Sequence, residues 1–327
     1  MNTCTALPTL QIAIPCYRRP ALLYRLLQSI SHAHLFEQVK VVIVDDSPEC
    51  ANKPIFIKGL ALGLDLHYIH NPDRLGIDAN IYKCMQFKNT DYVWLMGEDD
   101  LVTNDSISNI MLELKSSPNL IFANYSQLSD NGTHTLRDLT YASLPTDKQD
   151  FVDKLLIDFG FLGSVVVKTA IMPSSNFLEL GTFFSHIGSI ISIVDLSDFA
   201  QLRVLISPCS VNRVGGIDAF SWEADAMKVY TGFSRLLSYI ARECPPSTFS
   251  LRNSISRSRS TFYPLYKFTR VIRLKSCGLL SFREAYRLYR HHGGSLFGLL
   301  AALTPRPLAQ LLTQSAIRIL PKYRIFS

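Results

Sequence analysis

Three consecutive acidic residues, Glu98, Asp99 and Asp100, directly follow a hydrophobic run at 91–97. A divalent cation that neutralises a diphosphate needs hard oxygen ligands on a rigid element, with coordination positions left for phosphate oxygens. Carboxylates at the end of a strand supply such ligands, so the triplet is a candidate site for Mg²⁺ or Mn²⁺. The alternative is a solvated acidic turn that caps a helix beginning near 104–105.

A second acidic group, Asp45-Asp46-Ser47, also follows a hydrophobic run. A carboxylate in this position can accept hydrogen bonds from a base or a ribose, as the acidic residue of dinucleotide-binding folds does. An ordinary turn before Pro48 is the alternative. The chain contains neither G-x-G-x-x-G nor G-x-x-x-x-G-K-[ST], so the sequence supports neither a dinucleotide-binding fingerprint nor a P-loop.

An α/β domain must position these acidic groups, because short β-branched runs alternate with helical patterns over the first 125 residues. We expect a mostly parallel sheet flanked by helices, with polar residues at the carboxyl ends of the strands, where ligands bind in such sheets. The predicted strands cover 11–14, 40–44, 66–69, 91–96, 120–123, 163–167 and 203–206, and the main predicted helices cover 20–30, 183–196 and 221–242.

Four segments follow one another at close spacing: IAIPCYR (12–18), VIVDDS (42–47), the Asn71…Gly76…Asn80 spacing and DYVWLMGEDD (91–100). Together they resemble the family 2 glycosyltransferases with the GT-A fold, and most of all the abequosyltransferase-type members that build O-antigen and related polysaccharides. The resemblance covers 9–225 and is strongest over 9–125. It implies a Rossmann-like GT-A domain that binds a nucleotide-sugar donor.

The resemblance also implies roles for single residues. Glu98 and Asp100 fill the outer positions of a D-x-D-type motif, in which the last Asp holds Mg²⁺ or Mn²⁺ and the longer Glu98 side chain can favour the ribose. Asp99, between them, would face the nucleotide-sugar. The remaining residues expected to contact or line the nucleotide pocket are Pro15, Tyr17, Asp46, Asn71, Arg74, Gly76 and Asn80. For Tyr17, a packed aromatic ring at the strand exit is the alternative.

The implied reaction is inverting, and it needs a general base for the proton of the acceptor hydroxyl. Many relatives carry Glu-Asp at the start of a helix after the strand equivalent to 163–167, whereas this chain has Ser185-His186 there. An imidazole near its usual pKa of about 6.5 can serve as the base. A hydrogen-bonded helix histidine is the alternative, and Glu179 and Asp195 are the reserve candidates.

A glycine-containing loop over 207–220 is flanked by two further candidates, Arg213 and Trp222. If Gly215-Gly216 acts as a hinge, the loop can close over the donor, bring Arg213 to the diphosphate and place Trp222 under a sugar. An ordinary surface loop with a buried Trp222 is the alternative.

Basic charge is concentrated at the end of the chain. Residues 247–327 contain 14 Lys or Arg and a single acidic residue, Glu284, whereas 1–246 carry a net charge of −7. The pattern predicts basic amphipathic helices, with a capping box at Ser281–Glu284. Such helices suit an anionic membrane surface, and a bundle packed on the catalytic domain is the alternative. We place the boundary at Pro245-Pro246, between a GT-A domain (1–246) and a helical C-terminal region (247–327).

Several features indicate where the protein acts. Seven scattered cysteines without a C-x-x-C pair favour free thiols in a reducing compartment, and the first residues lack the pattern of a secretory signal. We therefore expect a cytoplasmic protein, peripheral on the inner face of the cell membrane. The expected partners are a nucleotide-sugar donor, a lipid-linked saccharide acceptor and the membrane surface, with no nucleic acid.

The predicted function is metal-dependent, inverting transfer of a hexose or deoxyhexose to a lipid-linked oligosaccharide during surface-polysaccharide (O-antigen-type) biosynthesis. Two alternatives remain open at this point. The acceptor can be a polyisoprenyl phosphate itself, or the chain can be a non-catalytic, membrane-associated scaffold with a GT-A fold.

Overall fold

The computed structural model describes residues 7–33, 37–87, 89–129, 134–136, 139, 143–173, 177–214, 226–255, 272, 275, 281–291 and 296–319. Its helices are α1 (Pro20–His32), α2 (Lys53–Leu60), α3 (Ile77–Met85), α4 (Ser106–Leu114), α5 (Lys148–Leu155), α6 (Ser185–Leu196), α7 (Ala226–Glu243), α10 (Phe282–His291), α11 (Leu296–Leu303) and α12 (Arg306–Ile319). Its strands are β1 (Leu10–Cys16), β2 (Val39–Asp45), β3 (Leu66–His70), β4 (Tyr92–Leu95), β5 (Leu101–Val102), β6 (Leu120–Ser129), β7 (His134–Leu136), β8 (Val165–Lys168) and β9 (Leu202–Val214).

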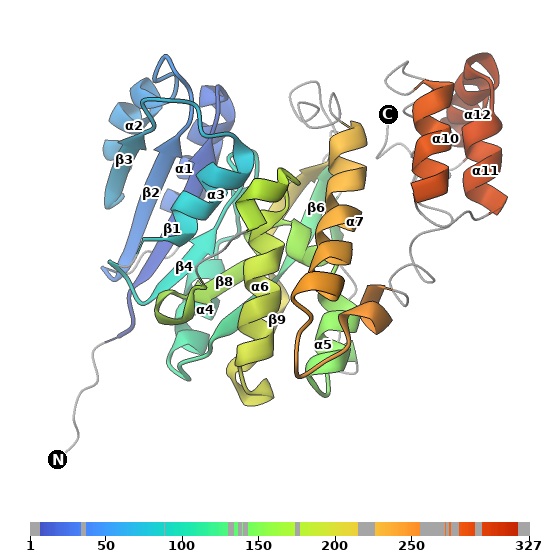
Figure 1. Ribbon diagram of the computed structural model, residues 1–327. Coiled ribbons are helices and arrows are strands. Elements are labelled where there is room, and N and C mark those ends of the chain that lie inside the picture. The colour runs from blue at the N-terminus through green and yellow to red at the C-terminus, as the bar shows by residue number, and fades with distance from the viewer. Residues whose placement is uncertain are drawn as a thin grey trace.

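The strands form one mixed sheet in the order β3-β2-β1-β4-β8-β6-β9-β5, with β7 paired to β6 (Figure 1). The first four strands pair in parallel, which confirms the parallel sheet predicted for the first part of the chain. Beyond β4 the sheet is mixed, because β8 runs antiparallel to both β4 and β6 while β6 and β9 pair in parallel. All seven predicted strands are present, and the two-residue strand β5 was not foreseen.

Helices cover both faces of the sheet, and the strands alternate between two hydrophobic cores. Val42 and Val44 of β2 pack on the face covered by α3, α5, α6 and α7, whereas Val41 and Ile43 pack on the face covered by α1, α2 and α4. Because the parallel strands are buried on both faces, they read as continuous apolar runs in the sequence. The result is a three-layer α/β/α domain, as predicted.

The predicted helix 183–196 begins two residues later than expected, at Ser185. Phe183 adopts a left-handed backbone conformation (φ 67°), and Phe184 is the N-cap residue, so neither can belong to the helix. The predicted start at Pro20 holds for α1. The last predicted helix, 221–242, corresponds to α7, while 221–225 lie outside the described residues.

The C-terminal region contains α10, α11 and α12, which lie together beyond α7, on the side away from β1–β3 (Figure 1). The predicted capping box is present, since Ser281 N and Oγ donate to Glu284 Oε2 at 2.8 and 2.6 Å. Among the described residues, no helix combines the length and apolar character needed to cross a bilayer.

The predicted domain boundary at Pro246 falls inside a packed part of the chain. Helix α7 ends just before the proline pair, but Ser247 N and Thr248 N then donate to Asp195 Oδ1 at 2.9 and 2.8 Å. Phe249 and Leu251 are buried in the core that α6 and α7 share. Residues 247–251 therefore pack on the α/β domain, and the boundary at Pro245-Pro246 stays a prediction.

Candidate functional site

The carboxyl ends of β1, β2, β3 and β4 meet at one edge of the sheet, where Asp46 is the central acceptor. Its Oδ1 accepts hydrogen bonds from Asn71 Nδ2 (2.9 Å) and Leu75 N (2.8 Å), and its Oδ2 accepts one from Gly76 N (2.9 Å). Gly76 has φ +83°, a conformation that favours glycine and that directs its N–H towards the carboxylate. The structure thus brings together three residues that the resemblance assigned to the nucleotide pocket.

Behind Asp46, a chain of amide groups fixes the orientation of the site. Asn71 Nδ2 also donates to Asn80 Oδ1 at 3.0 Å, and Asn80 Nδ2 donates to the Val44 carbonyl at 3.1 Å. Lys83 Nζ donates to Asn71 Oδ1 at 2.6 Å, so the Asn71 carbonyl must point to the lysine and its amide to Asp46. Lys83 was not predicted from the sequence, because its link to Asn71 depends on the angle at which α3 leaves the loop.

The neighbouring carboxylate, Asp45, has a different role. Its oxygens accept hydrogen bonds from Ser47 N, Asn52 N, Asn52 Nδ2 and Tyr68 Oη, the last at 2.6 Å. Burial alone would raise the pKa of Asp45, but the hydrogen bonds from Tyr68, Ser47 and Asn52 outweigh it and lower the pKa below its ordinary value. Asp45 therefore stabilises the loop after β2, and Asp46 faces the site.

The acidic loop Gly97–Asp100 follows β4 at the same edge. Glu98 Oε2 accepts a hydrogen bond from Tyr17 N at 3.0 Å, which ties the loop to the end of β1. A Cβ at Gly97 would lie 2.5 Å from Asp100 Oδ2, so only glycine leaves room for the Asp100 carboxylate to fold over residue 97. Both Glu98 and Asp100 are buried.

Arg19, at the N-cap of α1, supplies a positive charge to this loop. Its Nη1 lies 3.0 Å from Asp99 Oδ2, and its Nε lies 3.7 Å from Glu98 Oε1. Burial raises the pKa of Glu98 to about 8, and the Tyr17 N–H and the Arg19 charge oppose this only in part. Arg19 was not predicted from the sequence, because its partners Glu98 and Asp99 lie about 80 residues further along the chain.

The oxygen ligands of the loop fit Mg²⁺ or Mn²⁺, which prefer carboxylate and phosphate oxygens. Among the described residues, however, no group of three His, Cys, Asp or Glu could hold a metal by itself. Arg19 engages Glu98 and Asp99. Asp100 as the main protein ligand of a cation stays a prediction of the resemblance. Such a cation would need phosphate oxygens of a bound nucleotide to complete its coordination.

Tyr17 lies at the exit of β1, and two guanidinium groups contact its ring. Arg74 stacks on its ring at 4.5 Å from the centroid, and Arg18 lies at 5.3 Å. Pro15 is the preceding half-buried residue on β1. Arg18 has φ 56° and donates from its N–H to Ser47 Oγ at 2.8 Å, which links the loop after β1 to the loop after β2. Predicted residues from three loops thus share one edge.

The predicted base His186 lies in the first turn of α6, where it is buried. Its Nε2 is 3.1 Å from the Phe159 carbonyl, which can only accept, so Nε2 carries the proton. Burial lowers the pKa of His186 to about 4, and Nδ1 is buried without a hydrogen-bond partner. This geometry matches the alternative, a packed helix histidine, better than a base that meets an acceptor.

The two reserve candidates differ in position. Asp195 lies nine residues after His186 on α6, about 13 Å further along the helix axis, and its carboxylate binds the 247–248 segment. It is therefore not placed to act as the base. Glu179 is exposed on a short 3₁₀ turn (Phe177–Leu180) that contacts both α3 and α6.

Asp78 was missed by the sequence analysis. It is buried in the first turn of α3, where Oδ2 accepts from Phe183 N (2.8 Å) and Oδ1 from Ser185 N (2.9 Å). It thereby holds the start of α6 beside the Asp46 loop. No local pattern could show this, because the acceptor and its donors are more than 100 residues apart.

The structure tests the closing-loop prediction only in part. Trp222 and Gly215-Gly216 lie outside the described residues. Arg213 lies near the end of β9, where it pairs with Leu128 of β6. Their roles at the donor stay predictions.

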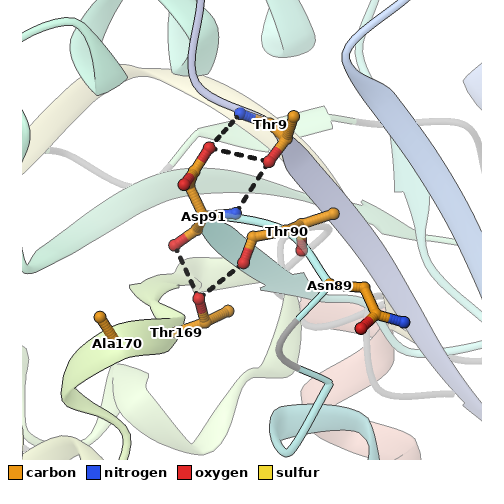
Figure 2. Close-up of a pocket in the computed structure, with 6 residues that line it drawn as sticks. All are labelled: Thr9, Asn89, Thr90, Asp91, Thr169 and Ala170. Atoms are coloured by element: carbon orange, nitrogen blue, oxygen red, sulfur yellow. Dashed lines mark hydrogen bonds between the residues drawn. The ribbon is translucent and has the colours of Figure 1, made fainter.

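A separate small pocket lies at the opposite, amino end of β1 and β4 (Figure 2). Thr9 N and Oγ1 each donate to Asp91 Oδ2 at 2.8 Å, and Thr169 Oγ1 donates to the Thr90 carbonyl at 2.6 Å. The hydrogen bonds from Thr9 lower the pKa of Asp91. These polar groups bind one another and tie three strands together, so the pocket is structural.

Comparison with known proteins shows what the α/β domain is similar to. Residues 11–171 match the family model described as glycosyl transferase family 2. The curated abequosyltransferase RfbV of Salmonella typhimurium is 22% identical over 263 residues. The aligned region covers 75% of this chain and 78% of the RfbV chain.

Solved structures share the fold at low identity. The mannosyltransferase PcManGT from Pyrobaculum calidifontis, in complex with GDP-Man and Mn²⁺, is 14% identical with a TM-score of 0.56, covering 98% of this chain and 83% of its own. S. aureus TarS is 11% identical with a TM-score of 0.57 over 97% of this chain. This chain spans 54% of the TarS chain.

Proposed function

Because residues 11–171 match the model of glycosyl transferase family 2, we propose that this chain is a nucleotide-sugar glycosyltransferase that transfers one sugar to a lipid-linked saccharide in surface-polysaccharide assembly. The observation that supports it most is the site edge, where the Asp46 network and the acidic loop lie side by side. The likeness to an abequosyltransferase supports an O-antigen-type product, a hexose or a deoxyhexose being the transferred group.

The proposed reaction is a single displacement with inversion at the anomeric carbon. The acceptor hydroxyl oxygen forms a bond to that carbon, the bond to the diphosphate oxygen breaks, and the nucleoside diphosphate leaves with the electron pair. A base takes the hydroxyl proton. Of the three predicted bases we retain Glu179, because it is exposed beside the start of α6, whereas His186 is buried and Asp195 lies at the far end of that helix.

In this proposal each loop binds a different part of the donor. Asp46 Oδ2 accepts one hydrogen bond from the protein and has capacity to accept another from a base or ribose, and Tyr17 and Arg74 offer a stacking surface. Asp100 would hold Mg²⁺ or Mn²⁺, which when bound supplies positive charge to the leaving diphosphate. Arg19 keeps Glu98 and Asp99 in place while this happens.

The acceptor and the location follow from the C-terminal region. With 14 basic residues and one acidic residue, 247–327 would be attracted to the anionic cytoplasmic face of a membrane, where lipid-linked saccharides are presented. The cysteines within the described residues are free thiols, as a reducing compartment requires. We therefore propose a peripheral protein on the inner face of the cell membrane, with no nucleic acid as partner.

The test is sugar transfer from a panel of UDP-, GDP-, CDP- and dTDP-sugars to lipid-linked saccharides in membranes, with and without Mn²⁺ or Mg²⁺. We expect one donor to be used in a metal-dependent way, and we expect Asp100→Ala to lower turnover by at least ~100-fold, the scale of losing a group that stabilises transition-state charge. Full activity of Asp100→Ala, or no transfer from any donor, would contradict the proposal.

A further inference from the structure

The helices α11 and α12 bury three alanines and expose five leucines. Ala301, Ala302 and Ala309 are 0% exposed. Five leucines on the same two helices, here called the leucine face, are between 41% and 60% exposed: Leu300, Leu303, Leu308, Leu311 and Leu312. A helical pair that folds for water alone buries its leucines first, so this arrangement indicates an apolar partner.

The leucine face is continuous along each helix. Leu300 and Leu303 are three residues apart on α11, and Leu308, Leu311 and Leu312 follow the i, i+3, i+4 pattern on α12. Only Thr304 and Pro305 separate the two helices, so the two stripes lie near one corner.

Packing within the region holds the leucines in this orientation. Ile272, Ala301 and Ala309 form a small buried cluster, in which alanines allow the helices to approach closely. Lys275 Nζ donates to the Ala302 carbonyl at 2.6 Å and lies 3.4 Å from the Ala301 carbonyl, which satisfies the end of α11. Turning the leucines inward would break these contacts.

Charge identifies the partner. Between 296 and 319 the charged residues are Arg306 and Arg318, without an acidic residue, and Glu284, the single acid of 247–327, is engaged by Ser281. Two copies of this chain meeting through the leucine face would bring like charges together. An anionic lipid surface offers both apolar depth and opposite charge.

We propose that the leucine face of α11 and α12 inserts into the interface of an anionic bilayer and anchors the protein there. This deepens the proposed function, on which it rests for the membrane-linked acceptor. The face would enter the acyl boundary while basic residues of the same region contact lipid headgroups.

The test is co-sedimentation of the full chain with vesicles of phosphatidylglycerol and phosphatidylethanolamine, compared with pure phosphatidylcholine. We expect binding to the anionic vesicles only, and at least a tenfold loss of binding in the Leu308→Gln/Leu311→Gln double variant. Leu112→Gln/Leu196→Gln is the matched control, since these leucines are 61% and 75% exposed on α4 and α6. The control should bind within twofold of the unchanged protein.

A second variant tests insertion directly. Tryptophan fluorescence of Leu311→Trp should shift to shorter wavelength on adding anionic vesicles, relative to the unsubstituted protein, whereas Leu112→Trp should not shift. Unchanged vesicle binding of the double glutamine variant, or no shift at 311, would overturn the proposal in favour of attraction by charge alone. A lipid-free dimer that the same glutamines dissociate would overturn it in favour of self-association.

The outcomes are separable from the proposed function. Nucleotide-induced thermal stabilisation of the double glutamine variant should equal that of the unchanged protein. If no nucleotide stabilises either protein but vesicle binding depends on the leucine face, the transferase proposal fails and the anchor stands. If nucleotides stabilise both proteins and vesicle binding ignores the leucine face, the anchor fails alone.

Discussion

The Asp46 cluster and the acidic loop lie at the same edge of the sheet but are built on opposite principles. Asp46 is held by three protein hydrogen bonds and is ready to receive a ligand without change. The acidic loop instead gathers three carboxylates near one guanidinium, and burial raises the pKa of Glu98 to about 8. Asp46 is oriented by hydrogen bonds and keeps one acceptor position on Oδ2 for a ligand, whereas the acidic loop carries charge that a cation would balance. From this contrast we predict that the nucleoside side of the proposed site is preformed and that the diphosphate side is assembled with its metal.

The largest expected effect is the loss of nucleotide binding on substitution of Asp46, which should distinguish it from the adjacent Asp45. Asp46→Asn turns an NH2 group towards either Gly76 N or the pair Asn71 Nδ2 and Leu75 N, so at least one N–H donor loses its acceptor. We expect a loss of ~2–4 kcal/mol of unfolding free energy and no nucleotide binding. Asp45→Asn should cost a similar amount, because Asp45 accepts four hydrogen bonds, yet the folded fraction should still bind nucleotide. Urea unfolding and nucleotide titration measure both, and nucleotide binding by Asp46→Asn would break the distinction.

The pH dependence of stability should have opposite signs in the two regions. Burial raises the pKa of Glu98 to about 8 in the folded protein, from an ordinary 4.5. The stabilisation that its protonated form gives the folded state is therefore full below pH 4.5 and is lost as pH rises to about 8. Glu98→Gln should therefore gain stability relative to the unchanged protein between pH 5 and 8. Asp45 has a lowered pKa, so its contribution is present at neutral pH and lost on acidification below its ordinary 3.8.

Thermal unfolding of both variants across pH 3–8 checks this pair of signs. A Glu98→Gln curve parallel to that of the unchanged protein from pH 5 to 8 would show that burial does not perturb Glu98. Added Mn²⁺ with nucleotide should reduce the difference, because a bound cation favours the ionised glutamate.

Removing the positive charge from the acidic loop should have a smaller effect. Arg19→Met leaves Glu98 and Asp99 without their counter-charge, and we expect a loss of ~1 kcal/mol and a steeper dependence of donor binding on metal concentration. Arg25→Met is the control, since Arg25 is exposed on the same helix. Mn²⁺ titration followed by electron paramagnetic resonance distinguishes them, and identical titrations would contradict a role for Arg19 at the loop.

The smallest expected effect concerns Lys83, which orients the Asn71 amide that donates to Asp46. Lys83→Met frees the Asn71 amide to rotate, so the KM for the donor should rise ~3–10-fold, the scale of one hydrogen bond, while kcat changes less. Lys58→Met, on the exposed side of α2, should leave both constants unchanged. A lower kcat with unchanged KM would show that Lys83 acts on the chemical step instead.

Much of the fold was predictable, because buried parallel strands carry continuous apolar runs that end in polar residues. The family resemblance had placed Asp46, Asn71, Gly76 and Asn80 at one pocket, and the structure has them in one hydrogen-bonded cluster. The contacts of Arg19, Lys83 and Asp78 were not predictable, since each depends on the packing angle of a helix against a distant loop. For the same reason the sequence could not show that His186 is buried or that residues 247–251 pack against the core of the α/β domain.

The central claim is that this edge of the sheet binds a nucleotide diphosphate together with a divalent cation on Asp100. The most direct measurement is thermal stability with UDP, GDP, CDP or dTDP, each with and without Mn²⁺ or Mg²⁺. We predict that one nucleotide stabilises the protein only with metal, by about 2.7 kcal/mol at a hundredfold excess over Kd, and that Asp100→Ala abolishes the metal-dependent part. No stabilisation by any nucleotide, or an equal metal-dependent shift in Asp100→Ala, would contradict the claim.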